Sequence, residues 1–286
     1  MKTETQKVSY ASYKEHVIAK LSQLKTWDRN GIFKRKGDHP KAHILPLSGE
    51  NNPKNRAKAI EKYMNFDCSP YFPNGMGLHQ YAHHLNSSQT LCLMFFARLI
   101  EKNRLSDFVK KAFGINIHDS ATYCFEYKQG YKKDFIFNVN GEEEYEGTSF
   151  DFHIQDDNTE IFFEIKFTEG GFGKATNDGR HRCKAMQYQK LLPENIQTIV
   201  TPEDILKFYQ LFRNIIRADN ENKYVIFITD GNNPSTNKDI CEFIDKYSKH
   251  LSLRLVIFKT WQELAEIYRE FAELPLQFKA LPSQLL

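Results

Sequence analysis

The chain has 286 residues, of which 41% are hydrophobic and 26% charged, a globular balance that argues against extensive disorder. Its five cysteines are scattered and form no Cys-x-x-Cys pair, so neither a disulfide scaffold nor a zinc ribbon is supported, and a reduced, cytoplasmic protein is expected. The N-terminal residues lack the apolar segment of a signal peptide, and no stretch approaches the length of a membrane span.

The net charge of +3 is distributed unevenly along the chain. Residues 1–60 contain 13 Lys and Arg against 5 Asp and Glu, whereas the remaining residues contain 26 against 31. Residues 142–164 hold nine acidic residues and no Lys or Arg. A basic arm and an acidic cluster in one chain favour a polyanion held near bound cations. An unevenly charged, solvated surface would give the same counts.

The first part of the chain predicts helices. Apolar residues recur at helical spacing, Asn52 before Pro53 predicts a helix start, and Gly114 predicts a helix end. Ser87 or Asn86 is the expected cap of a strongly apolar helix. The predicted helices are 7–27, 53–65, 87–103 and 106–113.

A basic loop, residues 28–52, separates the first two predicted helices. We expect its cluster of Lys34, Arg35 and Lys36 to contact DNA phosphates with little preference for sequence. Because charged runs more often serve solvation, an unchanged salt dependence of binding after their replacement would assign the loop to the solvated surface.

The pattern changes to strands mixed with helices after residue 120. Alternation and short apolar runs predict strands at 121–128, 132–139, 148–155, 160–168, 224–229 and 252–258. The predicted helices here are 181–192, 202–218, 238–249 and one that Thr260 and Glu263 open as a capping box. The order indicates a mixed α/β (α+β) fold, with an N-terminal helical extension (1–80) packed on a catalytic domain (81–286).

A predicted hairpin at 148–168 carries the chemistry. Side chains alternate between the two faces of a strand, so Asp151 shares a face with Ser149 and His153. On the second strand, Glu164 and Lys166 point away from an apolar face. The short turn makes the strands neighbours, and Asp151, Glu164 and Lys166 are expected to converge on one solvated face. The residues expected to face the core from the first strand are Phe150, Phe152 and Ile154.

Two converging carboxylates repel each other unless a cation lies between them. Oxygen ligands suit Mg²⁺, which can lower the pKa of a bound water and stabilise a phosphodiester transition state. Lys166 would position the attacking water or offset developing charge, and its acidic neighbours make it a poor general base. A surface ion pair between Glu164 and Lys166 is the simpler alternative.

These residues resemble the PD-(D/E)XK nuclease superfamily. Asp151, followed after twelve residues by Glu164-Ile165-Lys166, matches its motif, although Phe150 stands where Pro is common. The element order matches its restriction-endonuclease-like αβββαβ core across roughly residues 80–260. The segment 84–89, His-Leu-Asn-Ser-Ser-Gln, also looks like a group of restriction endonucleases within this superfamily.

The resemblance implies a metal-dependent endonuclease acting on double-stranded DNA. Asp151, Glu164 and the carbonyl of Ile165 would hold Mg²⁺, for which Mn²⁺ could substitute, and Lys166 would be the catalytic lysine. Relatives often add an acidic or amide group from the first core helix, where Gln89 is the best candidate. Weaker candidates are Glu101, Glu146, Gln187 and Gln189. Such enzymes often form homodimers, and two-fold DNA suits a two-fold protein.

Alternatives remain at this point. A repair or structure-specific nuclease would carry the same motif, and a non-catalytic nucleic-acid-binding protein could keep the fold. His79, His83 and His84 invite a zinc site, but no fourth ligand is apparent. The Gly-rich loop at 169–179 departs from the phosphate-binding consensus and is expected to lie over the active site.

Overall fold

The computed structural model describes residues 9–32, 39–128, 135–137, 143–145, 149–252 and 254–281. Its longer helices are α1 (Tyr10–Gln23), α2 (Pro53–Met64), α3 (Ser88–Glu101), α4 (Leu105–Phe113), α5 (Gly179–Leu191), α9 (Pro234–Tyr247) and α10 (Trp261–Tyr268). Its shorter helices are η1 (Pro73–Gly75), α6 (Glu194–Gln197), α7 (Pro202–Lys207), α8 (Tyr209–Ile215) and η3 (Leu276–Ala280). The strands are β1 (Thr122–Tyr127), β2 (Phe135–Phe137), β3 (Glu143–Tyr145), β4 (Phe150–Asp156), β5 (Thr159–Ile165), β6 (Lys223–Thr229) and β7 (Val256–Thr260).

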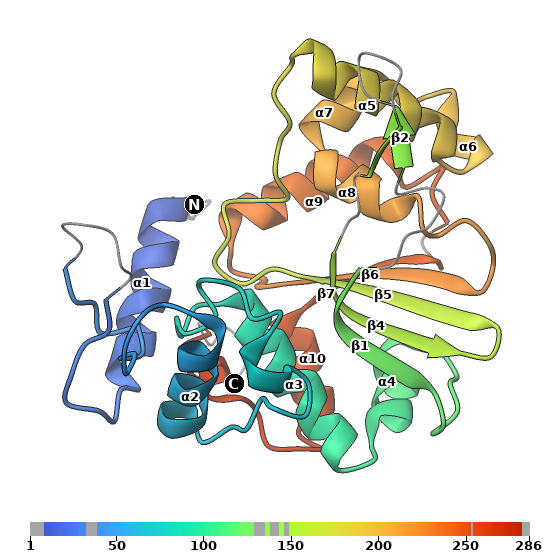
Figure 1. Ribbon diagram of the computed structural model, residues 1–286. Coiled ribbons are helices and arrows are strands. Elements are labelled where there is room, and N and C mark those ends of the chain that lie inside the picture. Colours follow the sequence, from blue (N-terminus) through green and yellow to red (C-terminus); the bar gives the residue numbers. More distant parts are fainter. Residues whose placement is uncertain are drawn as a thin grey trace, which may run out of the picture.

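A five-stranded mixed sheet, in the order β1-β4-β5-β6-β7, forms the centre of the molecule (Figure 1). The first three strands pair antiparallel, and β5, β6 and β7 pair parallel. Parallel neighbours require long crossover connections, which the chain provides as α5 to α8 and then α9. This arrangement confirms the predicted mixed α/β fold. A separate two-stranded sheet pairs β2 with β3.

Helices cover both faces of the central sheet (Figure 1). One face packs against α3, α4 and α10, and the other against α5, α7, α8 and α9. Alternating β5 residues therefore enter different cores, with Phe163 in the first and Phe162 in the second. The expectation of a solvated second face is wrong, because the crossover helices bury it.

The register of β4 also corrects one expected core residue. Phe152 lies in the first core as predicted, but Phe150 lies in the second core, against Phe162. The regular pairing of β4 with β5 begins at Phe152 opposite Phe163, so Phe150 lies beyond the last regular pair. Simple alternation fails where the ladder ends, close to Asp151.

Local sequence signals define most helix ends. Asn52 caps α2 ahead of Pro53, and Ser87 caps α3 by accepting a hydrogen bond from the Thr90 amide. The predicted capping box of Thr260 and Glu263 opens α10, which confirms this start signal. The predicted single helix at 202–218 is instead two, α7 and α8, separated at Phe208 with φ −113° and ψ 43°.

Helix α3 is the most deeply buried helix segment of the first core. Phe96 stacks on Phe152 with ring centroids 4.1 Å apart and contacts Phe163 at 4.9 Å. A helix that is apolar around most of its circumference must be enclosed, and here the sheet lies on one side and α10 on another. This packing holds α3 against β4 and β5.

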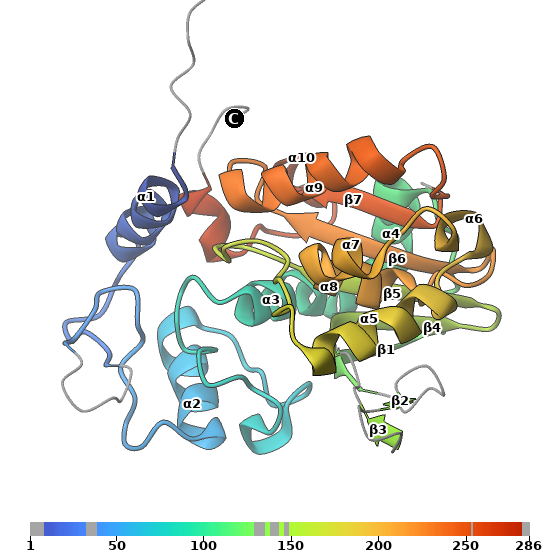
Figure 2. The same cartoon turned by 90° about the horizontal axis from the view of Figure 1, so that it is seen from above.

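The N-terminal helices α1 and α2 lie beside the sheet and its covering helices (Figures 1 and 2). One continuous core includes Val17 of α1, Ile60 of α2 and Phe95 of α3. Backbone hydrogen bonds join residues 43–45 to 83–85: the Leu45 amide donates to the His83 carbonyl at 2.9 Å, and the Leu85 amide donates to the His43 carbonyl at 2.8 Å. The division into 1–80 and 81–286 remains a prediction. Within the described ranges, no helix has the length and apolarity that a membrane span needs.

Candidate active site

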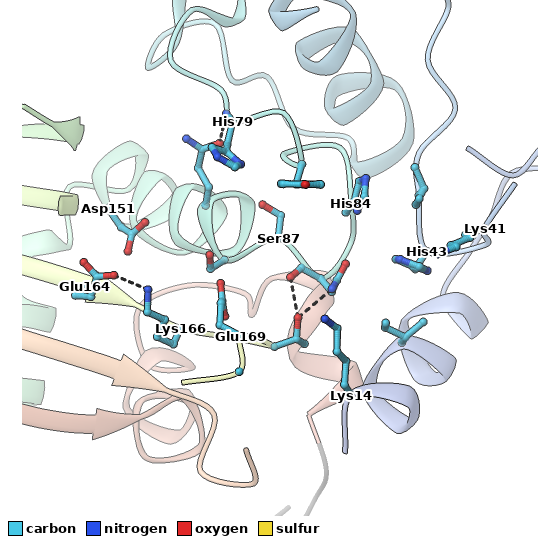
Figure 3. Close-up of a pocket in the computed structure, with 18 of the residues that line it drawn as sticks. Lys14, Lys41, His43, His79, His84, Ser87, Asp151, Glu164, Lys166 and Glu169 are labelled. Atoms are coloured by element: carbon cyan, nitrogen blue, oxygen red, sulfur yellow. Dashed lines mark hydrogen bonds and ion pairs between the residues drawn. The ribbon is translucent and has the colours of Figure 1, made fainter. Parts of the chain in front are cut away.

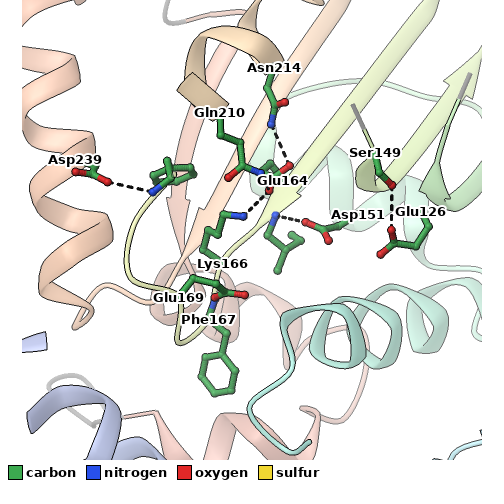
Figure 4. Close-up of polar contacts among 12 residues, drawn as sticks. Glu126, Ser149, Asp151, Glu164, Lys166, Phe167, Glu169, Gln210, Asn214 and Asp239 are labelled. Atoms are coloured by element: carbon green, nitrogen blue, oxygen red, sulfur yellow. Dashed lines mark hydrogen bonds and ion pairs between the residues drawn. The ribbon is translucent and has the colours of Figure 1, made fainter. Parts of the chain in front are cut away.

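Asp151 lies where β4 and β5 stop pairing. The regular ladder between these strands starts at Phe152, one residue later. At this point the Asp151 side chain replaces the backbone as hydrogen-bond acceptor, because its Oδ2 accepts a hydrogen bond from the Ile165 amide at 2.6 Å (Figure 4). The carboxylate is thus held against the end of β5, next to the backbone of Ile165.

Glu164 is the most enclosed acidic residue that lines the cavity, with 3% of its surface exposed. Its Oε1 accepts hydrogen bonds from Lys166 Nζ at 2.7 Å and Gln210 Nε2 at 2.6 Å, and its Oε2 accepts one from Asn214 Nδ2 at 3.0 Å. Gln210 and Asn214 are four residues apart and so point from one side of α8. Figure 4 shows both amides above Glu164. These contacts fix the position of the carboxylate and replace the hydrogen bonds to water that it loses on burial.

Lys166 follows β5 and is surrounded by acidic groups. Burial alone would lower its pKa, but the charges of Glu164, Glu169 and Asp151 raise the pKa above its ordinary value. Its side chain is 12% exposed. Its backbone is also fixed, because the amide donates to the Ile228 carbonyl at 2.8 Å and the carbonyl accepts from Trp261 Nε1 at 3.1 Å. The lysine is therefore a positioned, permanently charged ammonium at neutral pH.

A third carboxylate, Glu126, reaches the same region from β1. Its backbone φ is 52°, in the left-handed region, which is strained for a residue with a side chain. Pairing of β1 with β4 skips this position, since Phe125 pairs with Phe152 and Tyr127 with Phe150. The Glu126 carboxylate accepts hydrogen bonds from Gln89 Nε2 at 2.7 Å and Ser149 Oγ at 3.0 Å. Burial raises the pKa of Glu126, and these two hydrogen bonds oppose that rise.

The end of the cavity around Lys166 carries mostly acidic groups. Four carboxylates, those of Glu126, Asp151, Glu164 and Glu169, line the cavity together with the ammonium of Lys166. Burial and then the charge of Glu164 raise the pKa of Asp151 well above its ordinary value. Groups held this close in a low-dielectric site favour binding of a cation.

The donor chemistry fits a hard divalent cation such as Mg²⁺. Asp151, Glu164 and the backbone at Ile165 offer oxygen ligands only, which this ion prefers. The carboxylates of the cavity do not form a tight three-ligand group. In the described part of the chain, one cluster of three possible ligands within 4.8 Å of one another occurs instead at the far end of the hairpin, formed by the His118 imidazole and the carboxylates of Asp156 and Asp157. A metal in the cavity would therefore be held by two carboxylates, with a carbonyl and water completing its shell.

The cavity extends from these carboxylates to the N-terminal region (Figure 3). It has a volume of about 860 Å³, and its opposite wall carries Lys14 of α1 and Lys41. Rings from two segments also line the cavity, namely His43, His79, Tyr81 and His84. The expected basic arm thus contributes to the same cavity as the acidic motif, although Lys34, Arg35 and Lys36 lie outside the described residues.

The structure brings the four main predicted residues, Gln89, Asp151, Glu164 and Lys166, into this one cavity. Gln89 bonds to Glu126 and also accepts a hydrogen bond from the His79 amide at 2.7 Å, so it orients the cavity wall. The weaker candidates lie elsewhere or outside the described chain. Glu101 is exposed near Tyr71, and Gln187 forms hydrogen bonds within α5. Gln189 donates hydrogen bonds to the carbonyls of Gln197 and Val200. Glu146 lies outside the described residues.

Sequence reasoning missed Glu126, Glu169, Gln210 and Asn214. A signal was present for three of them. Glu126 is an acid within an otherwise aromatic strand, and Gln210 and Asn214 are amides four apart in an apolar helical segment. Glu169 begins a loop and gave no comparable signal.

Comparison with known proteins identifies the family. A family model described as "Restriction Endonuclease associating with ARP" matches residues 19–280, which include every element of the cavity apart from Tyr10, Lys14 and Ile18. Neither the curated proteins nor the solved structures contain a match.

Proposed function

The chain belongs to the family of restriction endonucleases associating with ARP, and we propose that it is a Mg²⁺-dependent endonuclease that cleaves double-stranded DNA. The observation that supports this proposal best is the placement of Asp151, Glu164 and Lys166 around one point at the end of β5. A surface ion pair would not explain why Glu164 is buried and held by two amides from α8.

Each residue has a defined role in this proposal. Asp151, Glu164 and the carbonyl of Ile165 would hold the ion, with Mn²⁺ as a substitute. When bound, the ion would supply a water of lowered pKa and neutralise charge on the phosphate. Lys166 stays protonated, so it would donate a hydrogen bond to the attacking water or to a phosphate oxygen and would not remove a proton. Gln210 and Asn214 would keep the Glu164 carboxylate oriented throughout.

The test is incubation of the purified chain with plasmid or phage DNA, with Mg²⁺ and with EDTA. Cleavage should require Mg²⁺ and should disappear in Asp151→Asn and Glu164→Gln. Asp157→Asn is the matched control, because Asp157 lies in the same hairpin but is 83% exposed at its far end. Cleavage by either cavity variant at the wild-type rate contradicts the metal site.

The same experiment separates the alternative functions. Binding of duplex DNA without cleavage would favour a non-catalytic nucleic-acid-binding protein. Cleavage restricted to branched or nicked DNA would favour a structure-specific nuclease. Homodimer formation is a further proposal, based on the resemblance, and sedimentation with and without a DNA duplex measures it.

A further inference from the structure

We propose that Lys14, Lys41 and His43 form a phosphate-binding subsite for the DNA strand next to the phosphate that is cleaved. The inference rests on the proposed function and adds to it a path for the substrate, from the carboxylates across the cavity to the N-terminal region. Helix α1 and residues 39–43 would then be part of the active site.

The two lysines share a continuous cavity with the catalytic residues. Lys14 and Lys41 line the same cavity as Asp151, Glu164 and Lys166, and Figure 3 shows them on the side opposite the carboxylates. A nucleic-acid strand carries one phosphate per nucleotide, so a strand that is bound at the carboxylates and follows the cavity brings its next phosphates to Lys14 and Lys41. Lysine side chains are common partners of DNA phosphates.

The positive charges of Lys14 and Lys41 are not neutralised by a neighbouring carboxylate of the described residues. Within the described ranges, neither Lys14 nor Lys41 has an acidic partner at ion-pair distance, although Lys14 lies over the ring of Tyr10 at 5.8 Å. Both lysines are close enough to His43 for their charges to act on it. Burial, then Lys41 and then Lys14 lower the pKa of His43 to about 4. His43 is therefore neutral at pH 7, and the two ammonium groups supply the positive charge.

The chemistry of this group suits a phosphate diester. Two ammonium groups attract the anionic oxygens, and a neutral imidazole can donate one N–H hydrogen bond. A phosphate would also shield the two lysines from each other. The positive charges of Lys14 and Lys41 would repel a second divalent cation from this subsite.

Hydrogen bonds hold the wall that carries Lys14 in a fixed position relative to Lys166. In α1, Tyr10 donates a hydrogen bond to the Thr168 carbonyl at 2.8 Å. Tyr13 donates to the Phe167 carbonyl at 3.0 Å and lies 2.6 Å from the buried Asp230 carboxylate. Lys14 follows Tyr13 directly, so its backbone is tied to the segment that follows Lys166.

The position of His43 is equally defined. Its carbonyl accepts the Leu85 amide, and its ring lies edge-on to that of His84 with centroids 5.8 Å apart. His84 belongs to the segment that leads into α3 and Gln89. Both halves of the subsite are therefore anchored to elements that also carry residues of the catalytic centre.

The test is equilibrium binding of a fluorescein-labelled duplex in Ca²⁺ over a range of salt concentrations. Lys14→Ala, Lys41→Ala and the double variant are compared with Lys20→Ala and Lys54→Ala, which are exposed lysines of α1 and α2 outside the cavity. Each lost phosphate contact should reduce the slope of log K against log salt by about 0.9, and the double variant by about 1.8. The controls should keep the wild-type slope, and Lys14→Gln should behave like Lys14→Ala.

The outcomes separate this inference from the proposed function. If the wild type binds the duplex but does not cleave it in Mg²⁺, the proposed nuclease activity is contradicted. The salt dependence of binding by the lysine variants still tests the subsite in that case. If the double variant keeps the wild-type slope and affinity, or if the wild type does not bind duplex DNA at low salt, the subsite is wrong. A melting temperature equal to that of the wild type shows that each variant is folded.

Discussion

Replacement of Lys166 by Met tests the electrostatics of the cavity most directly. The substitution keeps most of the side-chain length and removes the charge that lies 2.7 Å from Glu164 Oε1. Glu164 is only 3% exposed. Removal of one partner of a buried ion pair leaves an uncompensated charge and costs about 3–5 kcal/mol. We therefore expect Lys166→Met to be clearly less stable than the wild type in metal-free buffer.

The expected change in melting temperature follows from the size of the chain. One kcal/mol shifts the melting temperature of a large domain by roughly 2–4 °C, so the loss corresponds to roughly 6–20 °C. Lys246→Met is the control, because the Lys246–Asp204 ion pair is more exposed and its loss should cost at most about 1 kcal/mol. Calorimetry in EDTA measures both variants. Equal melting temperatures for Lys166→Met and the control would refute the buried pair.

Divalent cations should reverse part of this loss. Without Lys166, the carboxylates are less neutralised and should bind a cation more tightly. A ligand at 100 times its dissociation constant adds about 2.7 kcal/mol of stability. The melting temperature of Lys166→Met should therefore rise more on addition of Ca²⁺ than that of the wild type.

The same variant separates catalysis from binding. Loss of one positioned electrostatic group should slow single-turnover cleavage in Mg²⁺ by at least about 100-fold. Duplex affinity in Ca²⁺ should change little, because the N-terminal lysines remain. Weak binding together with wild-type cleavage at saturation would show instead that Lys166 is a phosphate anchor.

Three further predictions concern the metal, the core and pH. Asp151→Asn and Glu164→Gln should each abolish Mg²⁺-dependent cleavage without changing the circular dichroism spectrum, since each replaces a carboxylate by an amide of the same size. Phe96→Ala should lower the free energy of unfolding in urea by about 3–5 kcal/mol, because it empties the contact with Phe152, and a loss below 1 kcal/mol would contradict this packing. Burial and then the charge of Arg56 lower the pKa of His83 from 6.5 to about 4, so the unfolded chain binds this proton more tightly. Stability should thus fall as pH decreases from 6.5 towards 4, by up to about 1.4 kcal/mol per pH unit for this group, and His83→Asn should reduce that slope.

Much of the fold was accessible from the sequence because its signals are local. Asn52, Ser87 and Thr260 mark helix starts through hydrogen bonds that involve only neighbouring residues. The hairpin of β4 and β5 follows from alternation and a short turn. The convergence of Asp151 with Glu164 depends on that hairpin alone, which is why the motif could be placed before the structure was known.

The environment of the motif could not be read in the same way. Alternation assigns a face to Glu164 but does not say what covers it, and α8 lies about fifty residues later in the chain. Phe162 gave a hint, since an aromatic residue on the supposedly solvated face is typical of a strand buried on both sides. Glu126 enters the cavity only because its backbone departs from the regular strand, a deviation that no periodic pattern predicts.

The cavity carries groups of opposite charge at its two ends. Acidic residues of β1, β4, β5 and the following loop gather at one end, and lysines of α1 and of residues 39–43 lie at the other. In the described ranges, the lysines at one end form no ion pair with the carboxylates at the other. The two ends therefore stay available for ligands of opposite charge. A phosphodiester with its metal ion presents these two charges side by side. The separation of charge across the cavity is therefore consistent with one extended substrate that contacts both ends. Tyr10 and Tyr13 fix the position of one end relative to the other, because they donate hydrogen bonds from α1 to the segment after Lys166.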